Sequence, residues 1–454
     1  MMISRNKKGF ALVFSLVVVL LIILVCTAYF SVATNDLLLA NRVADSTRAY
    51  YLAEAGLADA FMKLRADLGT PASISASNNN YPVGPGNLTG SYAANCVSDG
   101  AAWPTYTITS TGTYHGVIKN LVLEVRMISF SRWDYVSNSE IWFGWPLWWV
   151  TGMVTTGPVF TNDQFNFFGT PIFNGPVGQF ASSINYFHTT SNPQNNPSGA
   201  LPLQDNPYFQ YGVTLNAPKM NVFSLPSAVL DRIRVEANSQ GLLLTGVSYV
   251  TLLSNGTMNI TNQNNGWNNH NVSIPVDTAV FVQNGMVTMP SGPPVYQNGD
   301  VLVQGPFVNG QLTIGSDNNL WIGGSLLYHD KADPDRTIYS GSDLLGLVAK
   351  NNVVINYQAA GDIEIDAYLV ALLGSFQASG YWVSYKGNMI QFGGLANQIC
   401  GPTGVMDPFG NVIAGYNQLQ YYDTRLEHMV PPWFPVVKDT AGRITYVKVR
   451  LTES

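Results

Sequence analysis

The sequence has few charged side chains for its length. Only 11% of its 454 residues are Asp, Glu, Lys or Arg, against roughly 25% in an ordinary soluble domain. The 22 Lys and Arg against 28 Asp and Glu give a formal net charge of −6, and no basic run follows Lys8. This acidic balance argues against nucleic acid as a partner. Because 46% of the residues are hydrophobic, the chain can bury a large core, which excludes wholesale disorder.

The residues that usually carry chemistry are also scarce. Three cysteines are too few for a disulfide scaffold or a Cys-rich metal site. The five histidines have no HxxxH or HExxH spacing, which a zinc site on a helix would need. No GxSxG, P-loop or dinucleotide fingerprint follows a strand pattern. We therefore expect no enzyme activity, no cofactor and no metal site.

A long uncharged run stands near the start of the chain. Phe10 to Ala33 contains no charged residue, and its 24 residues exceed the roughly 20 that cross a bilayer as a helix. Arg5, Lys7 and Lys8 precede it, and no basic cluster follows promptly. The positive-inside rule then predicts a cytoplasmic N-terminus and an exported remainder.

The helical pattern continues beyond the apolar run. Apolar residues recur at gaps of three and four from Tyr50 to Leu68, which places them on one helix face. Gly69 and Pro71 then form a helix stop. The sequence predicts one helix over residues 10–68, about 88 Å long at 1.5 Å per residue. Its first half would lie in lipid and its second half against a folded domain.

These features resemble the N-terminal region of type IV prepilins and pseudopilins. The short basic leader ends at Gly9, and Phe10 opens the apolar helix. The segment Arg48–Arg65, with its Ala-Glu-Ala-Gly-Leu run at Ala53–Leu57, is similar to PilX-type minor pilins. The resemblance covers about 65 residues. It implies cleavage after Gly9 by a prepilin peptidase, methylation of the new N-terminus at Phe10, insertion in the inner membrane, and association with other pilins or pseudopilins.

One position departs from the family pattern. Major pilins carry a glutamate as the fifth residue of the mature chain, and Phe14 stands there in this sequence. That carboxylate is thought to pair with a neighbouring N-terminal amine in the low-dielectric filament core, where an unpaired charge is costly. Phe14 cannot do this. The resemblance therefore implies a minor or tip subunit, or an anchored exported protein that never enters a filament.

The exported part is expected to be mainly β. Residues 69–104 are rich in Ser, Asn, Gly and Pro and indicate a linker, whereas Thr105–Tyr114 and Val117–Phe130 predict a pilin-like hairpin around His115-Gly116. Beyond it, short β-runs recur about every ten residues between Asn/Gly corners, which favours a parallel β-solenoid; a β-sandwich is the alternative. The expected organisation is a leader (1–9), a long helix (10–68), a linker with the hairpin (69–130) and a β-rich exterior domain (131–454).

Three groups of exterior residues could carry a function. Seven aromatic residues lie between Trp133 and Trp149; they would either pack in the core, the commoner fate, or stack on sugars or a partner. Asp362, Glu364 and Asp366 alternate and so share one strand face, as catalytic or Ca²⁺-binding carboxylates do in β-helical polysaccharide enzymes; a solvated face is the favoured interpretation. The third group is a loop that could surround Ca²⁺ or simply be solvated: Asp330, Asp333 and Asp335.

The cysteines allow one bridge. Cys26 lies inside the apolar run, which leaves Cys96 and Cys400 in Gly-flanked polar segments of the exported part. Exported compartments are often oxidising. A Cys96–Cys400 disulfide would tie the start of the exterior region to its end; two unrelated free thiols are the alternative.

Two functional hypotheses follow. The first is a single-pass inner-membrane, pilin-like structural or adhesive protein whose bulk is periplasmic or extracellular, a minor pilin or tip component of a type IV pilus or a related secretion system. The alternative is an anchored β-helical exoprotein that binds or degrades polysaccharide, with surface polysaccharide as its partner. The two differ in whether the row of carboxylates lines a groove beside a basic residue.

Overall fold

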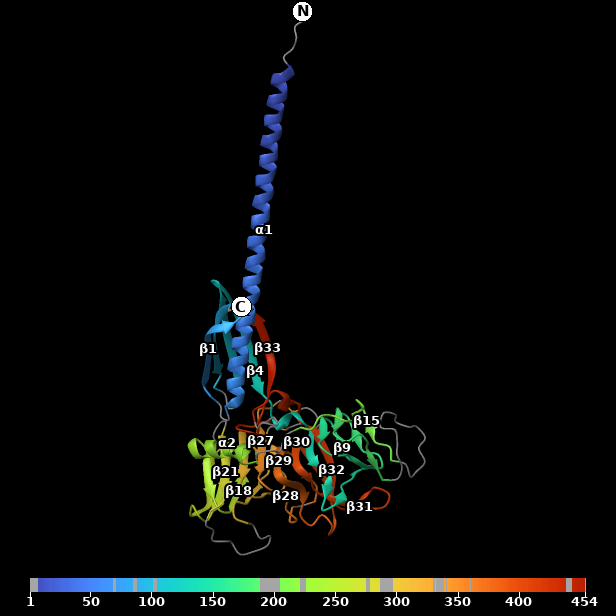
Figure 1. Cartoon of the computed structure of the whole chain (residues 1–454). Helices are drawn as coiled ribbons and strands as arrows, with labels where there is room; N and C mark the ends of the chain where they lie inside the picture. Colours follow the sequence, from blue (N-terminus) through green and yellow to red (C-terminus); the bar gives the residue numbers. More distant parts are fainter. Residues whose placement is uncertain are drawn as a thin grey trace, which may run out of the picture.

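The computed structural model describes residues 7–67, 71–84, 88–100, 104–187, 205–220, 226–274, 278–285, 297–329, 331, 339, 341–359, 361–437 and 443–453. The chain is mainly β, with one long apolar helix near the N-terminus, as expected. The helix projects from a small antiparallel sheet, below which a larger β-rich region extends sideways (Figure 1).

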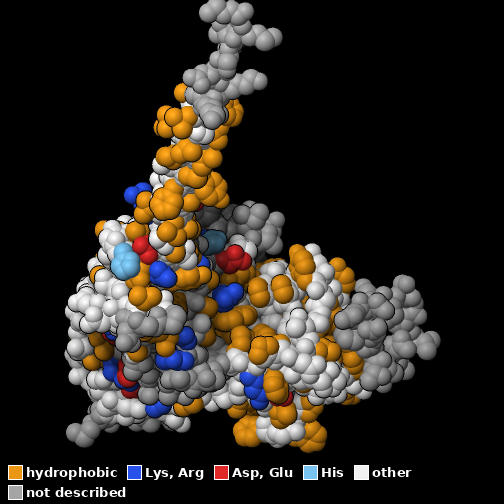
Figure 2. Space-filling view, turned by 45° about the horizontal axis from the view of Figure 1, so that its top comes forward, with side chains coloured by type: hydrophobic (Ala, Val, Ile, Leu, Met, Phe, Trp, Pro, Cys, Tyr) orange, Lys and Arg blue, Asp and Glu red, His pale blue; other side chains and the backbone are white. Residues whose placement is uncertain are grey.

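Helix α1 spans Lys7–Ala66, close to the predicted 10–68. Every residue from 12 to 43 is exposed, and hydrophobic side chains cover the visible face of this part of the rod (Figure 2). The second half buries one face, with spacings of three and four that follow the turn of the helix. The fully or nearly buried residues are Ala49, Leu52, Ala53, Leu57, Ala60 and Leu64.

A five-stranded antiparallel sheet covers this buried face. Its strands are β1 (Ser73–Pro82), β2 (Thr89–Ser98), β3 (Thr105–Tyr114), β4 (Val117–Met127) and β33 (Tyr446–Glu453), in that order across the sheet. The hairpin of β3 and β4 was predicted, because alternating apolar residues mark both strands. The expected linker 69–104 is wrong in part, since β1 and β2 lie within it.

The last strand enters this sheet from the far end of the chain. β33 pairs antiparallel with β4, from Tyr446 opposite Met127 to Glu453 opposite Leu121. Residues 128–445 are therefore an insertion between two hydrogen-bonded neighbours, and the boundary expected at 131 does not separate the C-terminal strand from the five-stranded sheet.

The exterior region is built on a 21-stranded sheet in the described residues, most of it parallel. Its first segment supplies β5 (Tyr135–Ser139), β9 (Val154–Thr155), β10 (Val159–Thr161), β12 (Ile172–Phe173), β13 (Val177–Gln179), β15 (Tyr208–Phe209) and β16 (Val213–Thr214). The second segment supplies β17 (Leu242–Thr245), β18 (Ser248–Leu252), β19 (Thr257–Asn262), β20 (Trp267–Ser273), β21 (Thr278–Gln283), β22 (Val301–Gln304), β24 (Gln311–Ser316), β25 (Leu320–Ile322), β27 (Leu344–Ala349), β28 (Val353–Ile355), β29 (Ile363–Ala378), β30 (Tyr385–Cys400), β31 (Gly404–Met406) and β32 (Val412–Tyr422).

Smaller elements complete the region. A hairpin is formed by β6 (Ile141–Trp142) and β7 (Trp145–Pro146). One parallel sheet has three strands, β8 (Trp149–Val150), β11 (Asn166–Phe168) and β14 (Asn185–Tyr186), and another has two, β23 (Phe307–Val308) and β26 (Leu327–Tyr328). The 3₁₀ turns are η1 (Phe130–Arg132) and η2 (Thr424–Glu427). Helix α2 (Pro226–Ser239) packs on β17, β21 and β24.

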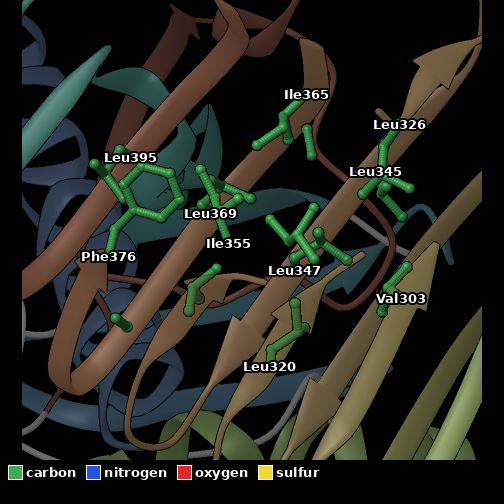
Figure 3. Close-up of a cluster of buried hydrophobic side chains, with 14 of the residues drawn as sticks. Val303, Leu320, Leu326, Leu345, Leu347, Ile355, Ile365, Leu369, Phe376 and Leu395 are labelled. Atoms are coloured by element: carbon green, nitrogen blue, oxygen red, sulfur yellow. The ribbon is translucent and has the colours of Figure 1, made fainter. Parts of the chain in front are cut away.

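In the second segment, parallel strands pair one after another in two rows that lie side by side. One row passes through β21, β24, β27 and β29, and the other through β22, β25, β28 and the far part of β29. Apolar side chains from both rows meet between them, among them Leu347, Leu320 and Ile355 (Figure 3). Among the described residues, these sheets do not close on themselves.

The two segments join out of sequence order. β5, the first strand of the region, pairs with β10 on one side and with β30 on the other. β9 likewise pairs with β12 and with β32. The chain thus enters in the middle of the 21-stranded sheet, called the ladder below, and forms one end of it with the first segment. It then passes through α2 to the other end and returns to the middle with the second segment (Figure 1).

Close approach of α1 to the sheet depends on Gly112 in β3. A Cβ atom at this position would lie 2.1 Å from the Ala49 carbonyl oxygen and 2.4 Å from the Ala53 nitrogen. Both contacts are backbone atoms of α1, which cannot turn aside. We predict that Gly112→Ala pushes the helix from the sheet and destabilises this packing by about 1–3 kcal/mol. Faster amide hydrogen exchange in residues 49–64 and in β3 is the measurement.

The matched control is Gly324→Ala, because a Cβ atom there meets nothing within 4 Å. Its exchange should equal that of the unaltered chain. Equal protection of α1 in the two variants would contradict the prediction.

Candidate functional site

The exposed half of α1 is the first candidate. In the described residues α1 is the one helix long and apolar enough to cross a membrane; its most apolar stretch of 18 residues has a mean hydropathy of 3.0 and is not buried within the chain. Phe14 lies on this half, 63% exposed. The predicted cleavage residues Gly9 and Phe10 fall within α1, but their side chains lie outside the described residues. The structure therefore supplies a membrane anchor candidate, and its processing stays a prediction.

The Cys96–Cys400 disulfide, one of the two alternatives that the sequence allows, is not formed. Cys96 and Cys400 are free thiols. Cys96 is buried in the core between α1 and its sheet, and Cys400 packs against the large core of the exterior region. The alternative of two free thiols holds, because the Gly-flanked segments are strands, β2 and β30, and the two cysteines pack in separate cores. Burial raises the pKa of the Cys96 thiol to about 11 and that of Cys400 above its usual range, so both stay protonated and weakly nucleophilic at neutral pH.

The carboxylate row does not form a solvated face. Asp362 is exposed, and its Oδ1 accepts a hydrogen bond from the Asn388 backbone N–H at 2.7 Å. Glu364 is partly buried and Asp366 is 0% exposed. Both bind Lys331, whose Nζ lies 2.8 Å from Glu364 Oε1 and 2.7 Å from Asp366 Oδ1. The alternation predicted one face correctly, but it could not reveal a lysine that comes from 33 residues away.

The calcium hypothesis concerns three further aspartates. Asp330, Asp333 and Asp335 lie outside the described residues, so the calcium hypothesis stays a prediction. In the described residues, no three His, Cys, Asp or Glu side chains gather as metal ligands would.

The aromatic group from 133 to 149 is split between core and surface. Tyr135 and Trp149 are buried, with ring centroids 5.0 Å apart in an edge-to-face contact. At the tip of the β6–β7 hairpin, in contrast, Phe143 is 87% and Trp145 is 76% exposed. Phe143 has φ +46°, a left-handed conformation that is uncommon for a bulky residue. This hairpin therefore presents two aromatic rings to solvent.

A cavity of about 130 Å³ lies between β30, β32 and the segment from 147 to 153. None of its lining residues is charged. Trp148, Trp149 and Phe376 are among the apolar walls, and Asn397 and Gln418 are among the polar ones. Such a lining suits an uncharged ligand group with an apolar face. Sequence patterns could not predict it, because its walls come from both segments of the ladder.

Two buried acids flank β5, the strand where the segments join. Asp134 Oδ2 accepts hydrogen bonds from the backbone N–H groups of Thr156 and Gly157, at 3.0 and 2.8 Å. Glu140 Oε1 accepts from the Tyr135 hydroxyl at 3.0 Å and from Ser137 Oγ. The second oxygen of each carboxyl has no hydrogen-bond partner among the described residues. Because burial disfavours the charged form, the pKa of each rises to about 7.

Comparison with known proteins identifies no family. No family model matches the chain, and no curated protein matches it. The crystal structure of the competence-associated pilin ComZ from Thermus thermophilus is similar at a TM-score of 0.31 and 10% identity, covering 90% of this chain and 98% of that one. A likeness at this level does not establish a common fold.

The two acids make stability depend on pH. The ordinary pKa values of Asp134 and Glu140 are 3.8 and 4.5, and both rise to about 7 in the folded chain. Between pH 4 and 7 the unfolded chain releases protons that the folded chain keeps, so stability falls as pH rises, by on the order of 3 kcal/mol for each group, and levels off above pH 7. Urea unfolding at a series of pH values, read by tryptophan fluorescence, measures this.

The substitution Asp134→Asn removes one titrating group and keeps an acceptor for the two N–H groups. It should flatten the fall by about half. A stability profile that rises from pH 4 to 7, or an unchanged slope in the variant, would show the assignment to be wrong.

Proposed function

We propose that this chain is a membrane-anchored, pilin-like structural or adhesive protein of the cell exterior, a minor pilin or tip component of a type IV pilus or a related secretion system. The observation that carries the proposal is the division of α1. Residues 12–33 carry no charged side chain and are all exposed, whereas the face around Ala53 and Leu57 is buried under an antiparallel sheet. A bare apolar helix needs lipid or neighbouring helices to cover it. The expected partners are the inner membrane, a prepilin peptidase and other pilins or pseudopilins.

The proposed orientation puts the N-terminus in the cytoplasm, because Lys7 and Lys8 precede the apolar run and no basic cluster follows it promptly. The exterior region is then periplasmic or extracellular. Phe14 supports a minor or tip position, since a phenyl ring cannot pair with the N-terminal amine of a neighbouring subunit within a filament core.

We further infer that the parallel rows wind as a β-solenoid. Asn351 donates to Asn318 Oδ1 at 2.7 Å and Asn352 donates to Asn319 Oδ1 at 3.0 Å, both across 33 residues. β24 pairs with β27, and β25 with β28, at the same interval. The strands of both rows and the Asn corner between them therefore repeat at the same interval of 33 residues, as successive coils of a solenoid do. A β-sandwich, built from antiparallel sheets, is not favoured by this parallel pairing.

We propose that the chain is not an enzyme. The carboxylates that could have served a hydrolase are bound by Lys331, and Asp366 is shut off from solvent. For the alternative, a protein that binds surface polysaccharide, the supporting observation is the exposed pair Phe143 and Trp145, because aromatic rings with one free face stack on sugars or dock on partners.

The leader prediction can be checked directly. Replacing Gly9 by leucine should leave the chain uncleaved, because the resemblance implies that the peptidase cuts after this glycine. Mass spectrometry of the N-terminus, in cells with an active prepilin peptidase, should find Phe10 first in the unaltered chain and Met1 first in the variant. Gly324→Ala is the control and should be cleaved. An unaltered chain that still begins at Met1 would refute the processing step.

The adhesive role predicts a second effect. The double substitution Phe143→Ser with Trp145→Ser should weaken attachment to cell-surface polysaccharide by roughly thirtyfold, since two aromatic contacts of about 1 kcal/mol each are lost. Folding should be unchanged, because both rings are largely exposed. The matched control is Tyr211→Ser, which removes another exposed ring, 67% exposed, away from the hairpin. Equal attachment of both variants would remove the hairpin from the adhesive surface.

A further inference from the structure

Lys331, Glu364 and Asp366 form a buried triad that the proposed function does not use. Ile365 points into the core (Figure 3), so its two neighbours on β29 share the opposite face of the strand. Lys331 Nζ lies between them, 2.7 Å from Asp366 Oδ1 and 2.8 Å from Glu364 Oε1. One amine thus contacts two carboxyl groups at hydrogen-bond distance.

The side chains of this triad are largely buried. The side chains of Lys331, Glu364 and Asp366 are 7%, 15% and 0% exposed. Nζ lies 4.2 Å from the ring centroid of Phe392. In such a place one cation cannot balance two anions without cost, and burial raises the pKa of the Asp366 carboxyl to about 6. A protonated Asp366 beside a lysine is thereby favoured more than it would be in water.

The backbone adds a donor at the remaining oxygen. The Tyr328 N–H donates to Asp366 Oδ2 at 2.9 Å, on the opposite side of the carboxyl from Lys331. A fixed N–H at this position stabilises negative charge that develops on a carbonyl oxygen under nucleophilic attack. The carboxyl carbon therefore has a nucleophile near one oxygen and an oxyanion donor at the other, with a second acid, Glu364, touching the nucleophile.

We propose that Lys331 and Asp366 join in an intramolecular amide bond, with Glu364 as the proton carrier. A proton passes from the ammonium to the Asp366 carboxylate, which leaves a neutral amine facing a carboxylic acid. The nitrogen then attacks Cγ, and the C–N bond forms while Tyr328 N–H holds the oxyanion. Glu364 takes a proton from the nitrogen and delivers it to Oδ1. The C–O bond breaks, and one water molecule leaves.

The balance of this step needs no outside reagent. An ammonium and a carboxylate become an amide and water, with no change of oxidation state. The driving force is proximity, because both partners are held in contact and water is kept from the product. The link would close the loop from 331 to 366 and tie β29 to the segment that precedes β27, in a chain whose cysteines are all free. This inference does not depend on the proposed function.

The test is peptide mapping of the full chain, extracted from membranes in detergent, denatured, and digested with trypsin and chymotrypsin. We expect a branched peptide that contains both Lys331 and Asp366 and is one water molecule lighter than its two linear parts. Trypsin should fail to cut after Lys331. Lys386, which contacts a tyrosine ring and a backbone carbonyl, is the internal control and should be cut. Linear peptides with a cleaved Lys331 would overturn the proposal.

Three variants separate the chemistry from simple ion pairing. Lys331→Arg keeps the charge and should give only linear peptides. Glu364→Gln keeps both bonding partners and nearly the same shape, and the linked fraction should fall from nearly all molecules to a small share. Asp366→Asn should still link, since ammonia can leave in place of water, and its product should equal the unaltered linked chain in mass. A fully linked Glu364→Gln chain would overturn the proton-carrier role.

Discussion

The pairing of β33 with β4 fixes how the whole exterior region is attached. The region leaves the five-stranded sheet after Met127 and returns to it at Tyr446, directly opposite. Ile128 donates to the Thr445 carbonyl at 2.9 Å, and Val437 donates to the Ile128 carbonyl at 2.8 Å, so the exit and entry strands are bonded beyond the sheet itself. Any force on the exterior region is therefore delivered to one edge of the sheet through two adjacent strands.

Side chains around Tyr446 connect this edge to both neighbours. The Tyr446 ring lies 5.8 Å from Phe61 on α1 and 6.0 Å from Tyr106 on β3. Arg232 of α2 donates to the Phe434 carbonyl at 3.3 Å and stacks over Trp433 at 5.4 Å, and its guanidinium lies within electrostatic range of the Tyr106 and Tyr446 side chains. The helix, the sheet and the exterior region thus meet around β33.

Sequence patterns predicted the elements that depend on neighbours in the chain. The helix over 10–68 and the hairpin of β3 and β4 follow from local periodicity, and both were found close to their expected bounds. β1 was missed because Ser and Asn make up six of its ten residues, and β2 because Gly, Ser and Asn interrupt its few apolar residues. Such residues are as typical of loops as of strands. The composition of these segments does not determine their conformation, because they become strands by pairing with neighbouring strands.

The missed features of the candidate sites are all long-range. Nothing near Glu364 or Asp366 in the sequence indicates Lys331, and nothing near Tyr135 indicates that its strand pairs with β30, 260 residues later in the chain. The buried acids Asp134 and Glu140 follow from that join, because a carboxyl group beside β5 is shut off from water only when both halves of the ladder are in place. Burial, and hence the raised pKa of Asp134 and Glu140, is a property of the assembled sheet.

The scarcity of charge fits this construction. Corners between strands are satisfied by amides that bond to the next corner, as Asn351 does to Asn318, and amides need no counter-ion. A ladder of this kind can bury polar corners without the desolvation cost of an ion. The few charges that it does bury are then conspicuous, since each needs a specific partner. Lys331 between Glu364 and Asp366 is such a place, where one buried lysine contacts two carboxyl groups.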